Sequence, residues 1–283
     1  MKTWAEQIKK NGNLLSKTEL EIVDFIRANP EKAAFMRQIE LCEEANVSKP
    51  LVISCFRKLQ YEDFKSFQQS IQDFYSNQIT SYQASTVVFR ETHDIGELLR
   101  HSINVDLQAL SSMEKLLNPE QIEMIAGKII TSSRVFILSD GTGFYPAHYL
   151  HRRLLRYGIS ASLIGPDRTR MLDELSGIKE SDCLIDFHYT QPGELINDLL
   201  SFSKKQGAYS VLITGKLDTD LVPLANQSIF VPRGQISFKN SMGVPMWFAN
   251  FLLLAVELKA GEPLQEHLKE LEKIRIKTEP EKY

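Results

Sequence analysis

The first 75 residues show the periodicity of amphipathic helices and none of the alternation that is typical of strands. Ser16-Lys-Thr-Glu19 has the spacing of a capping box, so it predicts the start of a helix that ends near Asn29-Pro30. Three more helices are expected, over about 37–44, over 49–59 with Ser48 as its N-cap, and over 64–74. The pattern therefore predicts an all-helical amino-terminal unit.

Residues 76–90 are polar and poor in helix-forming residues, which is typical of a linker. Beyond them the pattern predicts a long amphipathic helix over about 94–117. Another helix is expected from Pro119, with Asn118 as its N-cap, because proline lacks only an amide that the first turn does not use.

After Arg134 the pattern changes to short apolar runs separated by longer, mostly helical segments. Strands that are buried on both faces and alternate with helices indicate a doubly wound parallel sheet, here of five strands. In such sheets ligands bind at the carboxyl ends of the strands, near the point where the strand order reverses. The five runs are Val135–Leu138, Ser160–Ile164, Cys183–Phe187, Ser210–Thr214 and Ser228–Val231.

Composition narrows the class of protein. The 283 residues are 43% hydrophobic, enough for packed cores, and carry a net charge of −3, which argues against a protein that coats nucleic acid non-specifically. The three cysteines form no CxxC pair and fit a reducing cytoplasm. The most apolar stretch, Met246–Leu258, is about 13 residues long, shorter than a membrane span, and the amino terminus lacks the apolar run of a signal peptide.

A helix, a tight turn at 45–47 and a serine-capped helix together give the geometry of a helix-turn-helix, whose second helix enters the DNA major groove. The 49–59 helix contains three basic residues and no acid. Residues 1–80 nevertheless hold 11 basic and 11 acidic residues, so net charge does not distinguish this motif from a plain helical bundle. The candidate DNA-binding residues are Ser48, Lys49, Ser54, Arg57 and Lys58.

Several segments resemble the amino-terminal domain of RpiR-family transcriptional regulators. They are Leu15 to Ile26, Asn29-Pro30, Ala34-Phe-Met36, Val47-Ser48 and, above all, Phe56-Arg-Lys-Leu-Gln-Tyr-Glu-Asp-Phe-Lys65. The family's Arg-Lys-Leu-Gly-Tyr-x-Gly-Phe stretch is met here with Gln60 and Asp63 in place of its glycines. An arginine that is common in the family's recognition helix is replaced by Ser54.

The resemblance implies a carboxy-terminal sugar-isomerase-type (SIS) domain over about 105–260, in which loops after the first and third strands bind a sugar phosphate. The matching loops differ from the family's serine-rich pattern: Gly143 replaces a serine and Asp140 adds a negative charge, while His188, Thr190, Gln191 and Gly193 alter the second loop. A sugar phosphate, another small ligand, or no ligand in a domain kept for dimerisation all stay open. The candidate effector-binding residues are Ser139, Gly141, Thr142, Gly143, His188, Tyr189, Thr190, Gln191 and Gly193.

Three other kinds of site have weaker support in the sequence. Gly141 and Gly143 begin a dinucleotide fingerprint and Asp167 follows at a suitable distance, but Pro146 occupies the third glycine position. His148 and His151 share a helix face without an acidic or cysteine partner nearby, so no metal site is expected. Glu194 and His188 are the available acid–base candidates for an isomerase. No catalytic residue, cofactor or metal is therefore predicted.

Together these features predict a cytoplasmic, non-enzymatic regulator of carbohydrate metabolism with an all-helical head and an α/β body. Its expected partners are operator DNA, a sugar-phosphate-like effector and a second copy of the chain, as a homodimer or dimer of dimers, with no membrane. The alternatives are a sugar-phosphate isomerase with a helical appendage, or a regulator whose SIS domain only dimerises. The expected parts are 1–75 for DNA binding, 76–93 as linker, 94–262 as the SIS-type domain and 263–283 as a charged tail.

Overall fold

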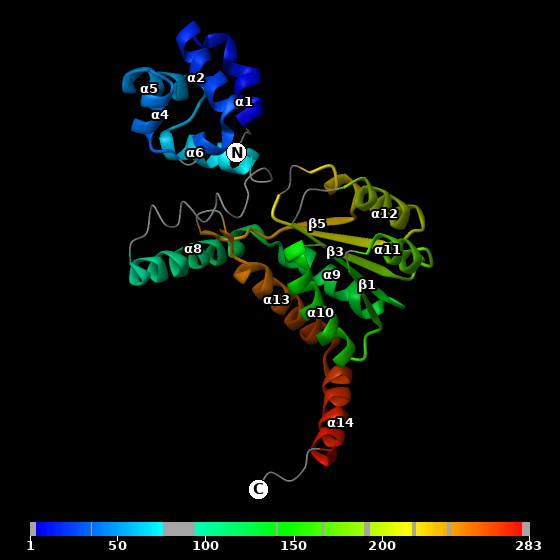
Figure 1. Ribbon diagram of the computed structural model, residues 1–283. Helices are drawn as coiled ribbons and strands as arrows, with labels where there is room; N and C mark the ends of the chain where they lie inside the picture. The colour runs from blue at the N-terminus through cyan, green and yellow to red at the C-terminus, as the bar shows by residue number, and fades with distance from the viewer. Residues whose placement is uncertain are drawn as a thin grey trace. The chain divides into compact units, whose positions relative to one another are not determined.

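The structure is a computed structural model that describes residues 4–34, 36–75, 94–139, 141–165, 167–189, 193–216, 219–236 and 239–278 (Figure 1). The chain divides into two compact units, Met1–Leu98 with Ser237–Lys239, and Leu99–Ile236 with Asn240–Tyr283. The predicted linker 76–93 lies outside the described residues.

The amino-terminal unit is helical, and its core is built around one aromatic side chain. Phe67 stacks on Phe56 with ring centroids 3.8 Å apart and meets Trp4 edge-on at 5.4 Å. Trp4 belongs to a first helix, which the sequence pattern did not predict as a separate element. The elements are α1 (Trp4–Asn11), a 3-10 turn (Gly12–Leu14), α2 (Lys17–Ala28), α3 (Pro30–Ala33), α4 (Gln38–Glu44), α5 (Lys49–Lys58) and α6 (Phe64–Tyr75).

The predicted capping box at the start of α2 is confirmed. The Glu19 amide donates to the Ser16 hydroxyl at 3.3 Å, and the Ser16 amide donates to the Glu19 carboxylate at 2.7 Å. Two amides that have no partner inside the helix are thereby satisfied, which fixes where α2 begins.

The two residues that replace family glycines behave differently. Gln60, just after α5, has φ of +64°, a conformation that costs a residue with a Cβ about 1 kcal/mol relative to glycine. Asp63 instead caps α6, because its carboxylate accepts from the Ser66 amide at 2.7 Å. That contact holds the pKa of Asp63 below its usual value. One replacement therefore leaves a strained residue, and the other adds a helix cap.

The second unit contains the predicted five-stranded sheet, and every pair of neighbouring strands is parallel. The strand order is β2-β1-β3-β4-β5, so the chain reverses its direction of winding between β1 and β3. The strands are β1 (Val135–Ser139), β2 (Ala161–Ile164), β3 (Cys183–His188), β4 (Tyr209–Thr214) and β5 (Gln227–Phe230), each within two residues of the predicted run.

Helices cover both faces of this sheet (Figure 1). One core joins the sheet to α9 (Pro119–Thr131), α10 (Phe144–Arg156) and α13 (Gly243–Ala260), and the other joins it to α11 (Arg168–Leu175) and α12 (Glu194–Lys205). Asn118 caps α9 as predicted, accepting from the Glu120 amide at 2.9 Å. The remaining elements are α8 (Ile95–Leu116), a 3-10 turn (Gly141–Gly143), a 3-10 turn (Val222–Leu224), a short ladder of β6 (Gln235–Ile236) with β7 (Lys239–Asn240), and α14 (Glu262–Thr278).

Two carboxy-terminal helices differ from expectation in length and packing. In the described part of the chain, α13 alone is long and apolar enough to pass a membrane-span test, with 18 residues where the apolar stretch suggested fewer. Its inner side chains, among them Phe248 and Leu252, are fully buried in the core, as in the core helix of a globular domain. The charged carboxy-terminal segment, expected to be a solvated helix, begins as α14, but Leu264 of α14 belongs to the same core.

Candidate DNA-binding helix and effector site

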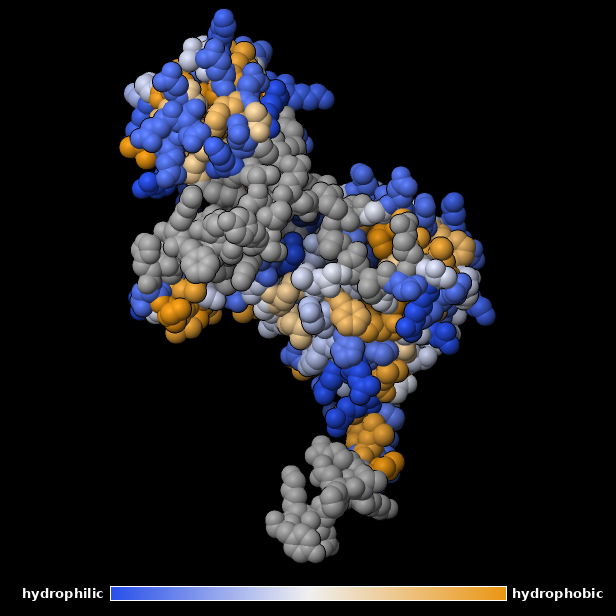
Figure 2. All heavy atoms as spheres, viewed as in Figure 1, coloured by the Kyte–Doolittle hydropathy of each residue, from blue (hydrophilic) through white to orange (hydrophobic). Residues whose placement is uncertain are grey.

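The predicted recognition helix α5 has one buried face and one solvent-facing face. Val52, Cys55 and Phe56 are buried in the helical core. The opposite face forms a shallow hollow of about 510 Å³, and the visible surface of this unit is mostly hydrophilic (Figure 2). The residues that line this hollow are spaced three and four positions apart along α5, so they lie on one side of the helix. They are Pro50, Ile53, Ser54, Arg57 and Lys58.

The turn before α5 and its first residues have the features expected of a helix-turn-helix. Asn46 has φ of +51°, a left-handed conformation that asparagine tolerates, and it reverses the chain between α4 and α5. Ser48 is the N-cap by backbone position, but its side chain makes no capping hydrogen bond and is exposed. Lys49 and Arg57 are exposed as well, so these three predicted residues lie where a DNA backbone could approach.

The other two predicted residues make contacts inside the protein. Lys58 Nζ lies 2.7 Å from one carboxylate oxygen of Glu19, and the Ser54 hydroxyl donates to the other at 2.8 Å. Glu19 is 1% exposed, and its burial raises its pKa, but hydrogen bonds from Lys58, from the Ser16 amide and from hydroxyls outweigh burial and lower the pKa to about 2. Glu19 therefore holds α5 against α2.

From the sequence, Glu19 was expected only to complete the capping box. Its second role, holding α5 against α2, was not predicted. The available signal was its position, since Glu19 precedes Ile22, Val23 and Ile26 by three, four and seven residues and so lies on the apolar face of α2. An acid on a buried face needs a partner, and α5 provides it.

In the α/β unit, the first predicted effector loop is packed tightly against β3. The Ser139 hydroxyl, buried at the end of β1, donates to the Phe187 carbonyl at 3.1 Å. A Cβ on Gly143 would lie 2.2 Å from that carbonyl oxygen and 2.8 Å from Ser139 Oγ. The position where the family has a serine therefore admits only glycine in this backbone, and Ser139 is engaged between the strands.

The structure does not bring all the predicted effector residues to one place. Tyr189 follows Phe187 in the alternation along β3 and belongs to the core under α9, α10 and α13. His188 lies on the opposite face with Asp186, with its Nδ1 3.7 Å from the carboxylate and both side chains buried. Gly141, Thr142 and Gly193 are exposed, and Thr190 and Gln191 lie outside the described residues.

Two helices begin directly after these loops, at the strand ends where the winding reverses. α10 follows Gly143, and α12 follows Gly193, which is its N-cap without a side-chain hydrogen bond. The first amides of a helix have no partner within the helix and carry the positive end of its dipole, so such ends favour an anion.

Arg233 is a residue at this edge that sequence analysis missed. It follows β5, and its guanidinium carbon lies 5.3 Å from the centre of the Tyr189 ring. Burial lowers the pKa of Arg233 and raises the pKa of Tyr189, whose buried hydroxyl has no hydrogen-bond partner in the part of the chain that the structure describes. The sequence signal that could have identified Arg233 was its position just beyond the last apolar run, at the edge where parallel sheets bind ligands.

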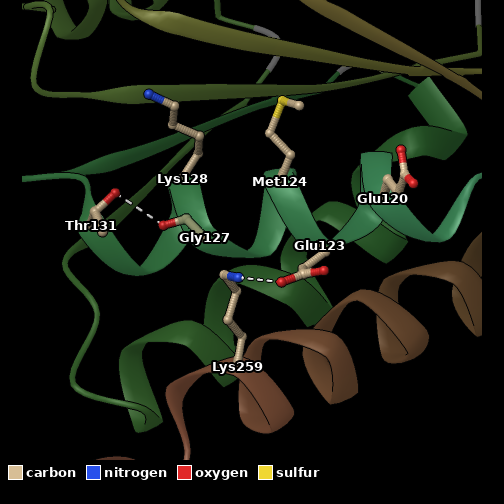
Figure 3. Close-up of a pocket in the computed structure, with 7 residues that line it drawn as sticks. All are labelled: Glu120, Glu123, Met124, Gly127, Lys128, Thr131 and Lys259. Carbon is tan, nitrogen blue, oxygen red and sulfur yellow. Dashed lines mark hydrogen bonds and ion pairs between the residues drawn. The ribbon is translucent and has the colours of Figure 1, made fainter.

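A second surface hollow, of about 400 Å³, lies between α9 and α13 (Figure 3). Its basic groups already interact with other side chains: Lys259 pairs with Glu123 at 2.7 Å, and Lys128 lies over the Tyr209 ring at 5.2 Å. Tyr209 begins β4, so this hollow is away from the carboxyl ends of the strands. Within the described ranges, no three His, Cys, Asp or Glu side chains are grouped so that they could hold a metal.

A helix-turn-helix unit joined to a doubly wound α/β unit has the architecture of a two-domain transcriptional regulator. Comparison with known proteins identifies the type. Residues 2–78 match the helix-turn-helix domain of the rpiR family, so the amino-terminal unit is a domain of that family. The comparisons favour a regulator over an isomerase with a helical appendage.

Two curated relatives align with this chain over most of their length. The chain is 24% identical over 228 residues, 80% of its length and 79% of the relative's, to an uncharacterized HTH-type transcriptional regulator in the aarA 3′ region of Providencia stuartii. It is 18% identical over 226 residues, covering 80% of this chain and 74% of the relative, to the HTH-type transcriptional regulator RpiR of Escherichia coli K12.

Two solved structures share the fold. The Vibrio vulnificus NanR protein complexed with ManNAc-6P aligns with a TM-score of 0.58 at 16% identity, over 96% of this chain and 98% of that protein. The sugar isomerase domain of an RpiR transcription factor from Sphaerobacter thermophilus aligns with a TM-score of 0.57 at 16% identity, over 62% of this chain and 97% of that domain. The predicted helical head and five-stranded SIS-type sheet are confirmed.

Proposed function

We propose that this chain is a cytoplasmic transcriptional regulator that binds operator DNA through α5 as a homodimer and responds to a sugar-phosphate-like effector. The observation that carries the proposal is the exposed face of α5, with Lys49 and Arg57 on the surface and the helix held in place by buried Glu19. A helix fixed in this way can present side chains to a major groove without first becoming ordered.

A second copy of the chain would strengthen DNA binding. One α5 carries few charges that are not already paired, so a single head would make few phosphate contacts. Two heads related by a two-fold axis double those contacts, and the operator should then contain two half-sites in a palindromic arrangement.

The effector half rests on the strand ends at β1 and β3. The winding of the sheet reverses there, and α10 and α12 direct their amide ends toward that edge. NanR, which has the same fold, is described in complex with ManNAc-6P. A sugar phosphate is therefore the first ligand to test. It can regulate only if it binds the DNA-competent and the DNA-free arrangements with different affinities.

The isomerase alternative lacks a poised acid–base pair. His188 is 2% exposed and lies with Asp186 on the face of β3 opposite Tyr189, whereas Glu194 is exposed at the start of α12. Proton transfer requires both groups within hydrogen-bond reach of one substrate. We therefore assign no catalytic role.

The test combines a gel shift on DNA from the protein's own promoter region with an isomerase assay on aldose and ketose phosphates. We expect retardation of the DNA, a change in retardation when ManNAc-6P or another sugar phosphate is added, and no turnover. Turnover without retardation would contradict the proposal. Retardation with no response and no thermal shift across a panel of sugar phosphates, hexosamine phosphates and amino sugars would favour a domain that only dimerises.

A further inference from the structure

Arg233 is a cation in an unusual setting. It is half-buried in the segment after β5, and it is anchored by its neighbour Val231, which is buried and donates its amide to the Thr214 carbonyl at 2.9 Å. Among the residues that the structure describes, its guanidinium contacts the Tyr189 ring. Taking a guanidinium out of water without an anion is costly, and an aromatic face offsets only part of that cost.

An acid on α8, Asp106, lies beside the segment that follows Arg233, and one of its two carboxylate oxygens is hydrogen-bonded. Asp106 accepts from the Ser241 hydroxyl at 2.9 Å and packs against Gly234, where a Cβ would come within 2.4 Å of its carboxylate. Among the described residues it forms no ion pair with Arg233. The guanidinium is thus held near the strand ends with its hydrogen-bonding capacity available.

Tyr189 supplies an independent indication of a ligand. Its side chain is 7% exposed, and its hydroxyl is buried with no hydrogen-bond partner among the described residues. Gly215, after β4, keeps the space beside both groups open, since a Cβ there would touch Tyr189 at 3.4 Å and Arg233 Nε at 3.9 Å. The segments after β3, β4 and β5, three neighbouring strands, therefore bring these groups together.

We propose that Arg233 and the Tyr189 hydroxyl bind the oxyanion of the effector, a phosphorylated or otherwise acidic sugar, at the carboxyl ends of β3 to β5. This inference rests on the proposed effector response. A guanidinium can donate two parallel hydrogen bonds to a phosphate or a carboxylate, and the phenol can donate a third. The site adds donors to those of the first loop, where Gly143 brings no hydroxyl and Ser139 is bonded to β3.

The experiment is calorimetric titration of the full-length protein at constant ionic strength. The probes are ManNAc-6P, inorganic phosphate, the neutral sugar N-acetylmannosamine and the sugar acid glucuronate. The variants are Arg233→Gln, Arg233→Lys and Tyr189→Phe. Arg134→Gln is the matched control, because Arg134 also lies over an aromatic ring, that of Phe136 at 5.6 Å, but precedes β1.

We expect the wild type to bind an acidic probe and to discriminate against the neutral sugar. Arg233→Gln should weaken that binding at least about tenfold, the loss typical of a charged hydrogen-bonding partner, with smaller losses for Arg233→Lys and Tyr189→Phe. Arg134→Gln should bind as the wild type does. Preference for ManNAc-6P over glucuronate identifies a phosphate as the group bound, and the reverse preference identifies a carboxylate.

Unchanged affinity in Arg233→Gln, or no binding of any acidic probe by the wild type, would overturn the inference. The thermal unfolding midpoint of the protein without ligand tests whether Arg233 has a structural role instead. The midpoint of Arg233→Gln should not fall below that of the wild type, because the variant removes a buried charge that lacks an anion among the described residues. A marked fall would also overturn it. Retardation of promoter DNA by the same variant is measured alongside, so that failure of this site is distinguished from failure of the proposed regulator.

Discussion

The two units contain cations in contrasting settings. In the helical unit Lys58 is paired with a buried acid, and the pair holds α5 on α2. In the α/β unit Arg233 is half-buried, and its guanidinium lies over the Tyr189 ring. The contrast shows that a basic residue near a candidate site has to be assigned by its partner. A cation that is already neutralised positions the fold, and one that has no anionic partner among the described residues is a candidate for binding a ligand.

The same contrast holds for residues that depart from the family pattern. The helical unit accommodates Gln60 with strain and uses Asp63 as a cap, so the fold survives both changes. In the α/β unit Gly143 is in direct contact with the Phe187 carbonyl and tolerates no side chain. At these positions that depart from the family pattern, substitution should therefore be forgiving in the helical unit and severe in the α/β unit.

The largest effect is expected for Gly143→Ser. The new Cβ would overlap the Phe187 carbonyl, so β1 and β3 must separate at their ends, and the α/β unit should lose about 3 kcal/mol of stability. Urea unfolding followed by circular dichroism measures this loss. Gly177→Ala is the matched control, because no atom lies within 4 Å of its added Cβ. Equal stability of the two variants would contradict the close contact.

The next effect is expected for Glu19→Gln, which should lower the stability of the helical unit by about 2–3 kcal/mol at neutral pH. Because the folded-state pKa of about 2 lies below the ordinary 4.5, the carboxylate stabilises the fold fully above about pH 5. That contribution is lost as pH falls from 5 toward 2.

Trp4 fluorescence in a Trp247→Phe background reports on this unit, since Trp4 is 1% exposed and lies within the helical core. The parent protein should lose stability across the window from pH 5 to pH 2, while Glu19→Gln should vary less. Parallel pH profiles for the two proteins would show that the Glu19 pKa is not displaced by folding.

The smallest effect is a gain of stability. Gln60→Gly should stabilise the helical unit by about 0.5–1 kcal/mol, because glycine adopts a φ of +64° without strain. Gln60→Ala retains a Cβ and should show no such gain. The Trp4 signal during denaturant unfolding measures both variants, and equal stabilities would contradict the strain at this position.

Local pattern was enough to predict much of the fold. The five apolar runs became five parallel strands, and Ser16 with Glu19 became a capping box, because both depend on residues near one another in sequence. The pairing of Glu19 with Lys58 and the approach of Arg233 to Tyr189 depend on packing between distant segments. Pattern alone therefore predicted the helices and strands but could not show which candidate residues already make contacts inside the protein.

The central claim is that α5 contacts DNA through its unpaired charges. The most direct test is the salt dependence of binding to a retarded promoter fragment, for the wild type, Arg57→Ala, Lys58→Ala and the control Lys9→Ala on α1. Each lost phosphate contact lowers the slope of log affinity against log salt by about one. We predict that decrease for Arg57→Ala, a smaller one for Lys58→Ala because Glu19 neutralises Lys58, and none for Lys9→Ala. An unchanged slope for Arg57→Ala would contradict the account.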